Sequence, residues 1–424
     1  EDRRVINPLS GQEMRFMTDD FVDPEFGTGI VKLTPAIDKN DYDVFQRNHK
    51  KDDPTSIQLH EVLHWDGSGK MHDASPYAGL SVHQARKKAI ADLEAKEVIS
   101  KVDEKYVHNV ALCKAGHQIE PMIIPNWFIK TNDEKISLKK PALEAVTSGK
   151  VKIYPKWREI TYIRWMEEMR DWPISRQNVW GIQIPVWYEV SDPNELYVWF
   201  INKAGAYTHG ILGTVLEQGA TLEEVSAGLQ RLVARPTVSW VFAEDKDPKK
   251  TYLPETDTFD TWFSSGQWPL VTLGYPDSED YNYFYPTAVL ETGWEIIRLW
   301  VSRMIMFGMY LDKENRPPFK EVYLHGIVKA LDGRKMSKSL GNVINPDEYI
   351  QQYGVDALRM GLISGTANGK DFSFPKDRVI AYKHFSNKIW NMGRFLLLMR
   401  EQYEKEIPLY ETLGKEQLSQ EDTT

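Results

Sequence analysis

Strands and helices alternate through the middle of this 424-residue chain, and this order limits the folds open to it. Residues 181–190 and 321–328 are short runs rich in β-branched and aromatic side chains, which are typical of strands. Between them, residues 295–311 carry large apolar side chains at steps of three and four residues, the period of a helix. These side chains are Ile296, Trp300, Met304 and Phe307. Helices that alternate with strands predict a parallel α/β sheet.

The first third of the chain has a different sequence pattern. Residues 29–33 form a β-rich run after a glycine pair and predict a strand. Residues 81–100 predict a helix that Ser81 caps. Pro121 and Pro125 then interrupt the chain, and an aromatic-rich stretch follows. We therefore expect one domain over residues 1–122 and another that begins at residue 123.

The α/β region extends over residues 123–345 and contains an insertion at about 191–256. Within this insertion we expect a helix near residues 222–234, capped by Thr221. The pattern becomes helical over residues 346–424, where apolar side chains mark one face of a long helix. These side chains are Phe385, Ile389, Met392, Leu396 and Met399.

The composition excludes several classes of protein. The chain has 61 acidic and 52 basic residues and a net charge of -9, so any RNA contact must come from a local basic stretch such as residues 376–400. A run of about 20 apolar residues is absent, so no membrane-spanning helix is expected. Cys113 is the only cysteine, which rules out a disulfide within the chain and a four-cysteine zinc site. We expect a reducing, cytoplasmic compartment.

The most specific motif is Lys335-Met336-Ser337-Lys338-Ser339, which follows a predicted strand and lies between Gly333 and Gly341. Two lysines three residues apart in a glycine-flanked loop can close on a triphosphate. Nucleotidyl transfer needs positive charge where negative charge develops. A solvated basic turn is the alternative for two lysines alone, but it does not account for the whole string.

This string resembles the KMSKS signature of the class I aminoacyl-tRNA synthetases. In that family the lysines of the loop stabilise the transition state in which ATP and an amino acid form an adenylate. The resemblance implies this role, and contact with ATP, for Lys335 and Lys338. It implies a shaping role for Ser339, and Mg²⁺ that accompanies ATP.

Other segments favour the subgroup of valine, isoleucine and leucine enzymes. Residues 174–188 resemble the ISRQ–WG–IP segment of this subgroup, with Ile182 where most valine enzymes have His. Residues 259–269 (FDTWFSSGQWP) resemble the DTWFSS–WP segment of the valine enzymes, and residues 292–306 resemble their TGFDII–WVARMI segment. The resemblance therefore favours the valine enzymes over their relatives.

The same resemblance implies the roles of four residues. Trp262 and Trp300 would form the walls of a pocket for the valine side chain, since two indole faces suit a small apolar group. Glu295 would bind the adenosine ribose, and Gly293 would permit close approach of the backbone. For isolated tryptophans, ordinary packing in a core is the alternative.

Residues 27–42 resemble the editing segment GTGxVKxTPAHDxxDY, with Ile37 in place of its His. The family uses this segment to hydrolyse threonine wrongly attached to the valine tRNA. The residues implied in this site are Lys32, Thr34, Asp38 and Asp41. The predicted strand puts its alternate side chains on one face. On the residues alone, a simple polar turn built by the two aspartates remains an equal alternative.

The resemblance covers only the middle of a synthetase. Residues 385–395 resemble the FxNKLWN–RF start of the helical anticodon-binding domain, whereas the His-x-Gly-His motif of the first half of the nucleotide-binding fold is absent. The first residue is Glu1, and no signal-peptide pattern follows it. We therefore expect an internal fragment that cannot activate valine alone.

The implied fold is α/β: the second half of a Rossmann-type catalytic core (123–345), part of an inserted β-rich editing domain (1–122), and a stem-contact region that leads into a helical anticodon-binding domain (346–424). The implied reaction is ATP-dependent activation of valine and its transfer to tRNA(Val), with editing of threonyl-tRNA(Val). The implied partners are tRNA(Val), valine and ATP, and a monomer is expected. An isoleucyl-type enzyme and a non-catalytic tRNA-binding paralogue are the alternatives.

Overall fold

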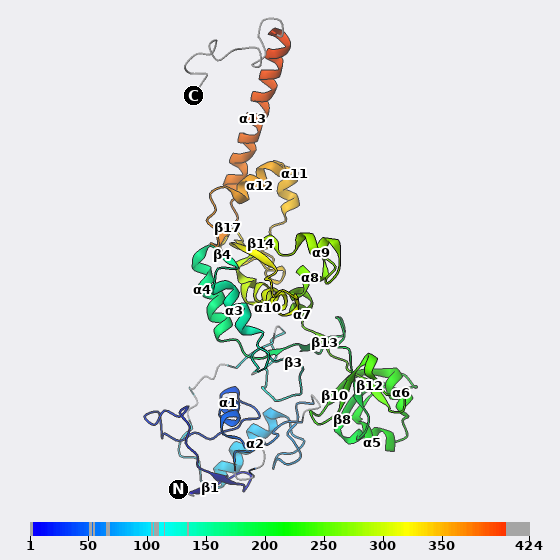
Figure 1. The fold of residues 1–424 in the computed structure, drawn as a ribbon. Coiled ribbons are helices and arrows are strands. Elements are labelled where there is room, and N and C mark those ends of the chain that lie inside the picture. Colours follow the sequence, from blue (N-terminus) through cyan, green and yellow to red (C-terminus); the bar gives the residue numbers. More distant parts are fainter. Residues whose placement is uncertain are drawn as a thin grey trace. The chain divides into compact units, whose positions relative to one another are not determined.

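The computed structural model describes residues 3–50, 53, 56–64, 68–102, 105, 110–113, 115–133 and 135–403, apart from the side chains of Ser339 and Tyr403. The chain divides into two compact units. Unit 1 consists of residues 1–127 and 175–258, and unit 2 consists of residues 128–174 and 259–424. Figure 1 shows the elements of each unit coloured along the sequence.

A three-stranded parallel sheet forms the centre of unit 2. Its strands are β4 (Lys152–Tyr154), β14 (Thr287–Gly293) and β15 (Phe319–His325), in the order β14-β15-β4. Register pairs such as Val289 with Glu321 connect the two longer strands. This sheet confirms the parallel arrangement that the alternation of helices and strands predicts.

The helices α3 (Lys139–Thr147), α4 (Glu159–Glu167) and α10 (Ser302–Leu311) pack with this sheet around one apolar core. The largest fully buried side chains of this core are Tyr162, Phe319, Ile153, Met166, Ile297, Met304, Ile305 and Met306. Burial of large apolar side chains is the main favourable term in folding, so this core holds the sheet edge in place.

The helix predicted for residues 295–311 is confirmed, but its first part is irregular. A 3₁₀ turn, η4 (Trp294–Ile296), leads into a π-helical turn, η5 (Ile297–Val301), and only then does α10 begin. A π-helical turn accommodates an extra residue and is frequent at functional sites. Trp300 lies on this turn.

The remaining elements of unit 2 surround this core or follow it in the sequence. They are β3 (Phe128–Ile129), η1 (Lys156–Arg158), β5 (Trp172–Pro173), α7 (Thr261–Gly266), α8 (Trp268–Val271), α9 (Glu279–Phe284), β16 (Val328–Lys329), η6 (Lys338–Leu340), α11 (Pro346–Tyr353), α12 (Val355–Ile363), β17 (Phe372–Ser373) and α13 (Lys376–Tyr403). Strands β16 and β17 pair in parallel, so the chain after α12 returns to the region that follows β15.

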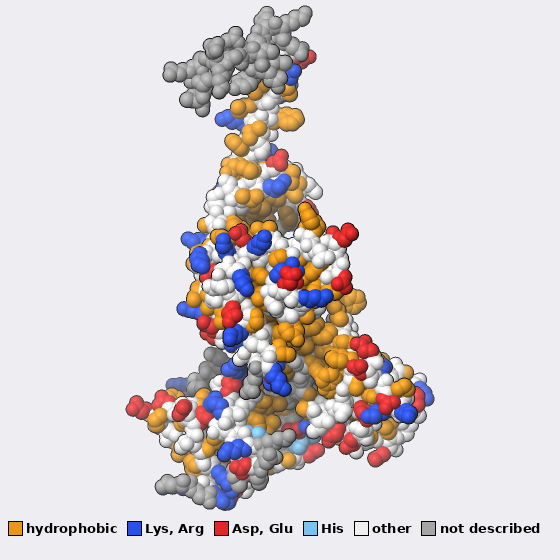
Figure 2. Space-filling model, viewed as in Figure 1, with side chains coloured by type: hydrophobic (Ala, Val, Ile, Leu, Met, Phe, Trp, Pro, Cys, Tyr) orange, Lys and Arg blue, Asp and Glu red, His pale blue; other side chains and the backbone are white. Residues whose placement is uncertain are grey.

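The predicted apolar face of the last helix lies on α13 and is exposed. Phe385, Ile389 and Leu396 keep 47%, 55% and 64% of their surface accessible. Figure 2 shows apolar side chains along this helix.

The first part of unit 1 contains β1 (Arg4–Ile6), β2 (Glu13–Arg15), α1 (Lys39–Asn48) and α2 (Val82–Ala95). Ser81 caps α2 through a capping box with Gln84, which confirms the predicted helix start. The strand predicted for residues 29–33 is wrong, because the structure has no strand there. A strand needs a hydrogen-bonded neighbour, and Ile30 and Val31 are instead exposed without a ladder among the described residues.

The second part of unit 1 holds two three-stranded antiparallel sheets. One is β11-β7-β12, made of β7 (Val186–Glu189), β11 (Trp240–Phe242) and β12 (Tyr252–Pro254). The strand predicted over 181–190 is therefore confirmed only for its second half. The shorter elements are β6 (Ser175–Arg176), η2 (Pro193–Glu195) and η3 (Ala243–Asp245), and β13 (Thr258–Phe259) begins at the end of this unit.

The other sheet is β10-β8-β9 and lies within the predicted insertion. Its strands are β8 (Leu196–Ile201), β9 (Tyr207–Ile211) and β10 (Leu229–Ala234), and the helices α5 (Leu212–Glu217) and α6 (Leu222–Gly228) lie between β9 and β10 in the sequence. Thr221 caps α6 as predicted, but the helix ends at Gly228 rather than at residue 234. A Cβ at Gly228 would overlap the carbonyl oxygen of Ile201, and β10 then pairs with β8. Pairing with a distant strand thus overrides the local helix signal.

Candidate functional site

The carboxyl ends of the parallel strands in unit 2 bring several polar side chains together. Strand β14 ends at Gly293 and β15 ends at His325, whose Nδ1 bonds the carboxylate of Glu291. In open α/β sheets, ligands bind at the carboxyl ends of the strands. This edge is therefore the candidate site of unit 2.

Glu295 is placed for an interaction that the described residues do not supply. Its Oε2 is buried and has no hydrogen-bond partner among them. A Cβ at Gly293 would lie only 2.5 Å from this oxygen, so a side chain there would push the Glu295 carboxylate aside. A buried acceptor without a donor is costly, and a ligand hydroxyl is the kind of group that would satisfy it. The sequence-predicted pair of Gly293 and Glu295 thus lies together at the sheet edge.

The loop that carries the two predicted catalytic lysines begins as a hairpin. Lys329 and Lys335 form an antiparallel bridge, and Gly333, with φ +78°, makes the turn between them. The backbone N–H and side chain of Arg334 both bond Asp332, at 3.0 and 2.7 Å, and these bonds hold the pKa of that carboxyl below its ordinary value. Both bonds are local, since they join residues two apart at the tip of the turn.

Asn342 closes the second half of the same loop. Its Oδ1 accepts a hydrogen bond from the Ser337 N–H at 2.8 Å, and its Nδ2 donates to the Lys335 carbonyl at 3.2 Å. The side chains of Lys335 and Lys338 are exposed, so their ammonium groups can reach a ligand. The side chain of Ser339 lies outside the described residues.

The two predicted pocket tryptophans come from neighbouring elements of unit 2. Trp262 follows Asp260, the N-cap of α7, and is half-buried. Trp300 comes from the π-helical turn, and its Nε1 donates to the Ser265 carbonyl on α7 at 2.9 Å. This bond fixes the Trp300 ring against the helix that carries Trp262. Partly buried indoles are available to an apolar ligand group in a way that fully buried ones are not.

A buried cation lies behind this pair. Arg303 is 5% exposed, its guanidinium stacks on Trp172 at 4.0 Å, and its Nε has no hydrogen-bond partner among the described residues. Burial lowers the pKa of Arg303 to about 10, and the charge of Asp260 acts against this effect. Asp260 also accepts a hydrogen bond from Trp172 Nε1 at 3.0 Å.

The predicted editing residues of unit 1 lie on an irregular segment and the start of α1. Asp38 caps α1 by accepting the N–H groups of Asn40 and Asp41. Asp41 is buried, and its Oδ2 accepts the backbone N–H of Thr34 at 2.6 Å and the Thr34 hydroxyl at 3.2 Å. Lys32 is exposed and does not share a strand face with Thr34, because no strand forms there. The structure thus gathers Thr34, Asp38 and Asp41 into one turn.

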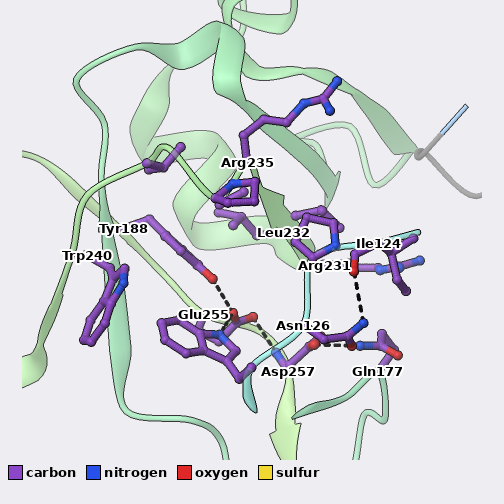
Figure 3. A pocket seen from close by; sticks show the side chains of 16 residues that line it. Ile124, Asn126, Gln177, Tyr188, Arg231, Leu232, Arg235, Trp240, Glu255 and Asp257 are labelled. Atoms are coloured by element: carbon purple, nitrogen blue, oxygen red, sulfur yellow. Dashed lines mark hydrogen bonds between the residues drawn. The ribbon is translucent and has the colours of Figure 1, made fainter. Parts of the chain in front are cut away.

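A separate cavity of about 240 Å³ lies within unit 1. Two buried acids line it (Figure 3): Glu255 accepts hydrogen bonds from Tyr188 Oη at 2.7 Å and Trp127 Nε1 at 2.6 Å, and Asp257 accepts one from Gln177 Nε2 at 2.6 Å. Burial and the charge of Glu255 raise the pKa of Asp257 to about 6. Nothing in the sequence patterns above pointed to this cavity.

Two features are absent from the described part of the chain. No group of three or more His, Cys, Asp or Glu side chains there could hold a metal ion. No helix there is both long and apolar enough to cross a membrane.

Sequence reasoning missed two residues of the unit 2 site. Asn342 lies beside the lysine motif, and its position three residues after Ser339 was a usable signal. Asp371, which bonds Trp294 and Lys329, carries no local signal because its partners are distant in sequence.

The comparisons with known proteins agree on one family. The profile of "tRNA synthetases class I (I, L, M and V)" matches residues 33–375. The valine–tRNA ligases of Clostridium tetani and Clostridium acetobutylicum are each 40% identical over 399 and 397 residues, which is 93% of this chain and 39% of each relative. The chain thus spans about two fifths of the length of these relatives.

A solved structure of methionyl-tRNA synthetase from Mycobacterium tuberculosis, in complex with methionyl-adenylate, also matches. It is 18% identical, the match covers 65% of this chain and 40% of that chain, and the TM-score is 0.38. The family assignment rests instead on the sequence profile, which covers most of the chain. The chain belongs to the class I tRNA synthetases of the isoleucine, leucine, methionine and valine group.

Proposed function

We propose that this chain is part of a valine–tRNA ligase, which activates valine with ATP and transfers it to tRNA(Val). The observation that carries the proposal is the Glu295 carboxylate just after β14, whose buried Oε2 has no donor among the described residues and faces the glycine at 293. The ribose hydroxyls of ATP would supply that donor. A nucleotide at this edge also follows the general rule for open α/β sheets.

In this proposal the exposed lysines of the loop act on the phosphates of ATP. Lys335 and Lys338 are three residues apart on a segment that Asn342 bonds at Lys335 and at Ser337. Their positive charge would stabilise the pentacoordinate phosphorus of adenylate formation, where negative charge builds up on the α-phosphate oxygens. Mg²⁺ would enter with ATP and neutralise part of the triphosphate charge.

Valine would bind against Trp262 and Trp300. The bond from Trp300 Nε1 to Ser265 holds one indole in a single orientation, which a selective apolar pocket requires. Such a pocket rejects threonine poorly, because an isosteric side chain that carries a hydroxyl still fits. An apolar pocket of this kind discriminates valine from threonine by only about a hundredfold. A second, hydrolytic site is therefore needed.

We assign that hydrolytic site to unit 1, with threonyl-tRNA(Val) as its substrate. The Oδ2 of Asp41 is occupied by Thr34, and the carboxylate keeps a second oxygen that could accept the ammonium group of the amino acid. An anchored ammonium group would orient the ester for attack by water. Asp38 would keep the turn in place by capping α1.

The remaining assignments belong to the same proposal. Residues 346–424 would form the stem-contact region and the start of the anticodon-binding domain, and the protein would act in the cytoplasm as a monomer. The isolated chain is not expected to activate valine, because about three fifths of the length of its relatives has no counterpart here.

A chimaera tests the proposal. In it, this chain replaces the 399-residue region of the Clostridium tetani valine–tRNA ligase that it matches. Valine-dependent exchange of pyrophosphate into ATP is the expected result, and the isolated chain serves as the negative control. Exchange that depends on isoleucine instead of valine would indicate an isoleucyl-type enzyme. Binding of tRNA without exchange would indicate a non-catalytic paralogue and would overturn the proposal.

A further inference from the structure

Asp371 connects three segments at the carboxyl edge of the parallel sheet in unit 2. Its Oδ1 accepts the indole N–H of Trp294 at 2.7 Å and the backbone N–H of Ile327 at 2.9 Å. Its Oδ2 lies 3.3 Å from the Nζ of Lys329. Trp294 follows β14, Ile327 follows β15, and Lys329 pairs with Lys335 at the base of the lysine loop.

The segment that carries Asp371 is held close to this edge by its own backbone. A Cβ at Gly326 would overlap the Lys370 carbonyl, so the chain can approach this closely only because residue 326 is a glycine. Immediately after Asp371, β17 pairs in parallel with β16. The carboxylate is therefore brought to its partners by two backbone contacts that do not depend on its charge.

A second cation supports the same arrangement. The Arg158 guanidinium lies between the rings of Trp157 and Trp294, at 4.1 and 3.8 Å from their centres, and donates to the Gly369 carbonyl at 2.9 Å. Burial lowers the pKa of Arg158, and the negative charge of Asp371 counteracts this effect. The Trp294 indole is thus fixed on its face by Arg158 and on its edge by Asp371.

We propose that Asp371 is a positioning residue that holds the nucleotide-facing end of β14 and the base of the Lys335–Lys338 loop in one arrangement. This inference rests on the proposed function, because it treats Glu295, next to Trp294, as the ribose ligand. Asp371 acts mainly through its bonds to Trp294 and to Ile327, which leads into the base of the loop, and does not touch the nucleotide itself. A carboxylate that accepts from both segments keeps their spacing constant, and binding groups displaced by about 1 Å can lose a large part of their effect.

Because the two oxygens of Asp371 have different partners, two substitutions can distinguish the effect of its hydrogen bonds from the effect of its charge. Asp371→Asn keeps Oδ1 for Trp294 and Ile327 and replaces only the oxygen that faces Lys329. That ion pair is partly exposed, with 36% and 23% of the two side chains accessible, so its removal has little effect. Asp371→Ala removes all three contacts and leaves two N–H groups without an acceptor. The Ala variant is therefore expected to be much more affected than the Asn variant.

The first experiment measures the arrangement in the whole chain without a ligand. Indole-¹⁵N tryptophan labelling gives a signal for the Trp294 Nε1–H, which Trp294→Phe identifies, and amide exchange measured by mass spectrometry reports on Ile327. In Asp371→Ala the indole signal should move and the Ile327 peptide should exchange faster. Asp371→Asn should stay close to wild type, as should the exposed control Asp377→Asn.

The second experiment places the same variants in the chimaera, adds ATP and follows the Trp294 signal. The expected result is a weaker apparent affinity for ATP in Asp371→Ala, by about tenfold, with Asp371→Asn near wild type. Unchanged affinity in an Ala variant that has lost both bonds would overturn the positioning role and leave the nucleotide site standing. A chimaera with wild-type Asp371 that does not respond to ATP would contradict the proposed nucleotide site, and the inference would fall with it. Equal damage in the Asn and Ala variants would also overturn it.

Discussion

Replacing Asp257 by Asn is expected to stabilise unit 1 at neutral pH. The Asp257 side chain lines the cavity in Figure 3, is 8% exposed, and is two residues from Glu255, which is 4% exposed. Burial and the charge of Glu255 raise the pKa of Asp257 from 3.8 to about 6. The carboxylate is therefore ionised at pH 7 in surroundings that disfavour its charge. Asparagine keeps an acceptor for Gln177 and removes that charge.

The size of the effect follows from the two pKa values. The difference between 3.8 and about 6 corresponds to about 3 kcal/mol. Between these values the folded state retains a proton that the unfolded state has released, so the free energy of unfolding falls as the pH rises through this window. Part of this loss is already present at pH 4. Between pH 4 and pH 7.5, the advantage of Asp257→Asn over the wild type should therefore grow by about 2 kcal/mol.

The assay compares the two proteins at both pH values. Because the chain has two units, a single unfolding transition does not report on unit 1 alone. Urea-dependent amide exchange of peptides from β7, β8 and β12 gives the free energy of unfolding of this unit. Asp245→Asn removes an exposed carboxylate from the same unit and is the matched control.

Two outcomes would refute this reasoning. If Asp257→Asn changes the free energy of unfolding equally at pH 4 and pH 7.5, Asp257 does not titrate within the window. If the variant is less stable than the wild type at pH 7.5, the ionised carboxylate is stabilised by its neighbours, and the raised pKa is wrong.

Three predictions concern the chimaera. Lys335→Ala and Lys338→Ala should each raise the activation free energy of adenylate formation by about 2–4 kcal/mol and leave KM for valine unchanged. An unchanged kcat in pyrophosphate exchange would contradict the role of these lysines. Trp262→Ala and Trp300→Ala should shift the ratio of kcat/KM values towards isoleucine, whereas folded variants with full discrimination would contradict the pocket. Asp41→Ala should lose most deacylation of threonyl-tRNA and keep valine activation. Normal deacylation would contradict the assignment of Asp41 to the editing site. Loss of both activities would indicate misfolding, for which Asp41→Asn is the control.

Features with a local cause could be predicted from the sequence. The spacing of apolar residues determined the helix before Leu311 and the strand that follows it, because both periods arise from the backbone itself. Ser81 and Gln84 determined the start of α2, because a capping box needs only residues three apart. The resemblance pointed to Gly293 and Glu295, and the structure places the Glu295 carboxylate beside Gly293.

Features that depend on a distant partner could not be predicted in this way. The β-rich run at 29–33 forms no strand, and residues 229–234 form one against β8 although they follow a helix. The same pattern of residues is compatible with a strand or with another conformation. A strand forms only where another segment of the chain pairs with it through backbone hydrogen bonds.

The candidate site shows this division most clearly. The sequence by itself determined which loop carries the lysines, since Lys335 and Lys338 lie within one short motif. Only the tertiary structure places Asp371 against Trp294, 77 residues away, and Ile327, 44 residues away. The physical reason is that a hydrogen bond depends on distance in space, and the parallel sheet brings the ends of separate strands to one edge.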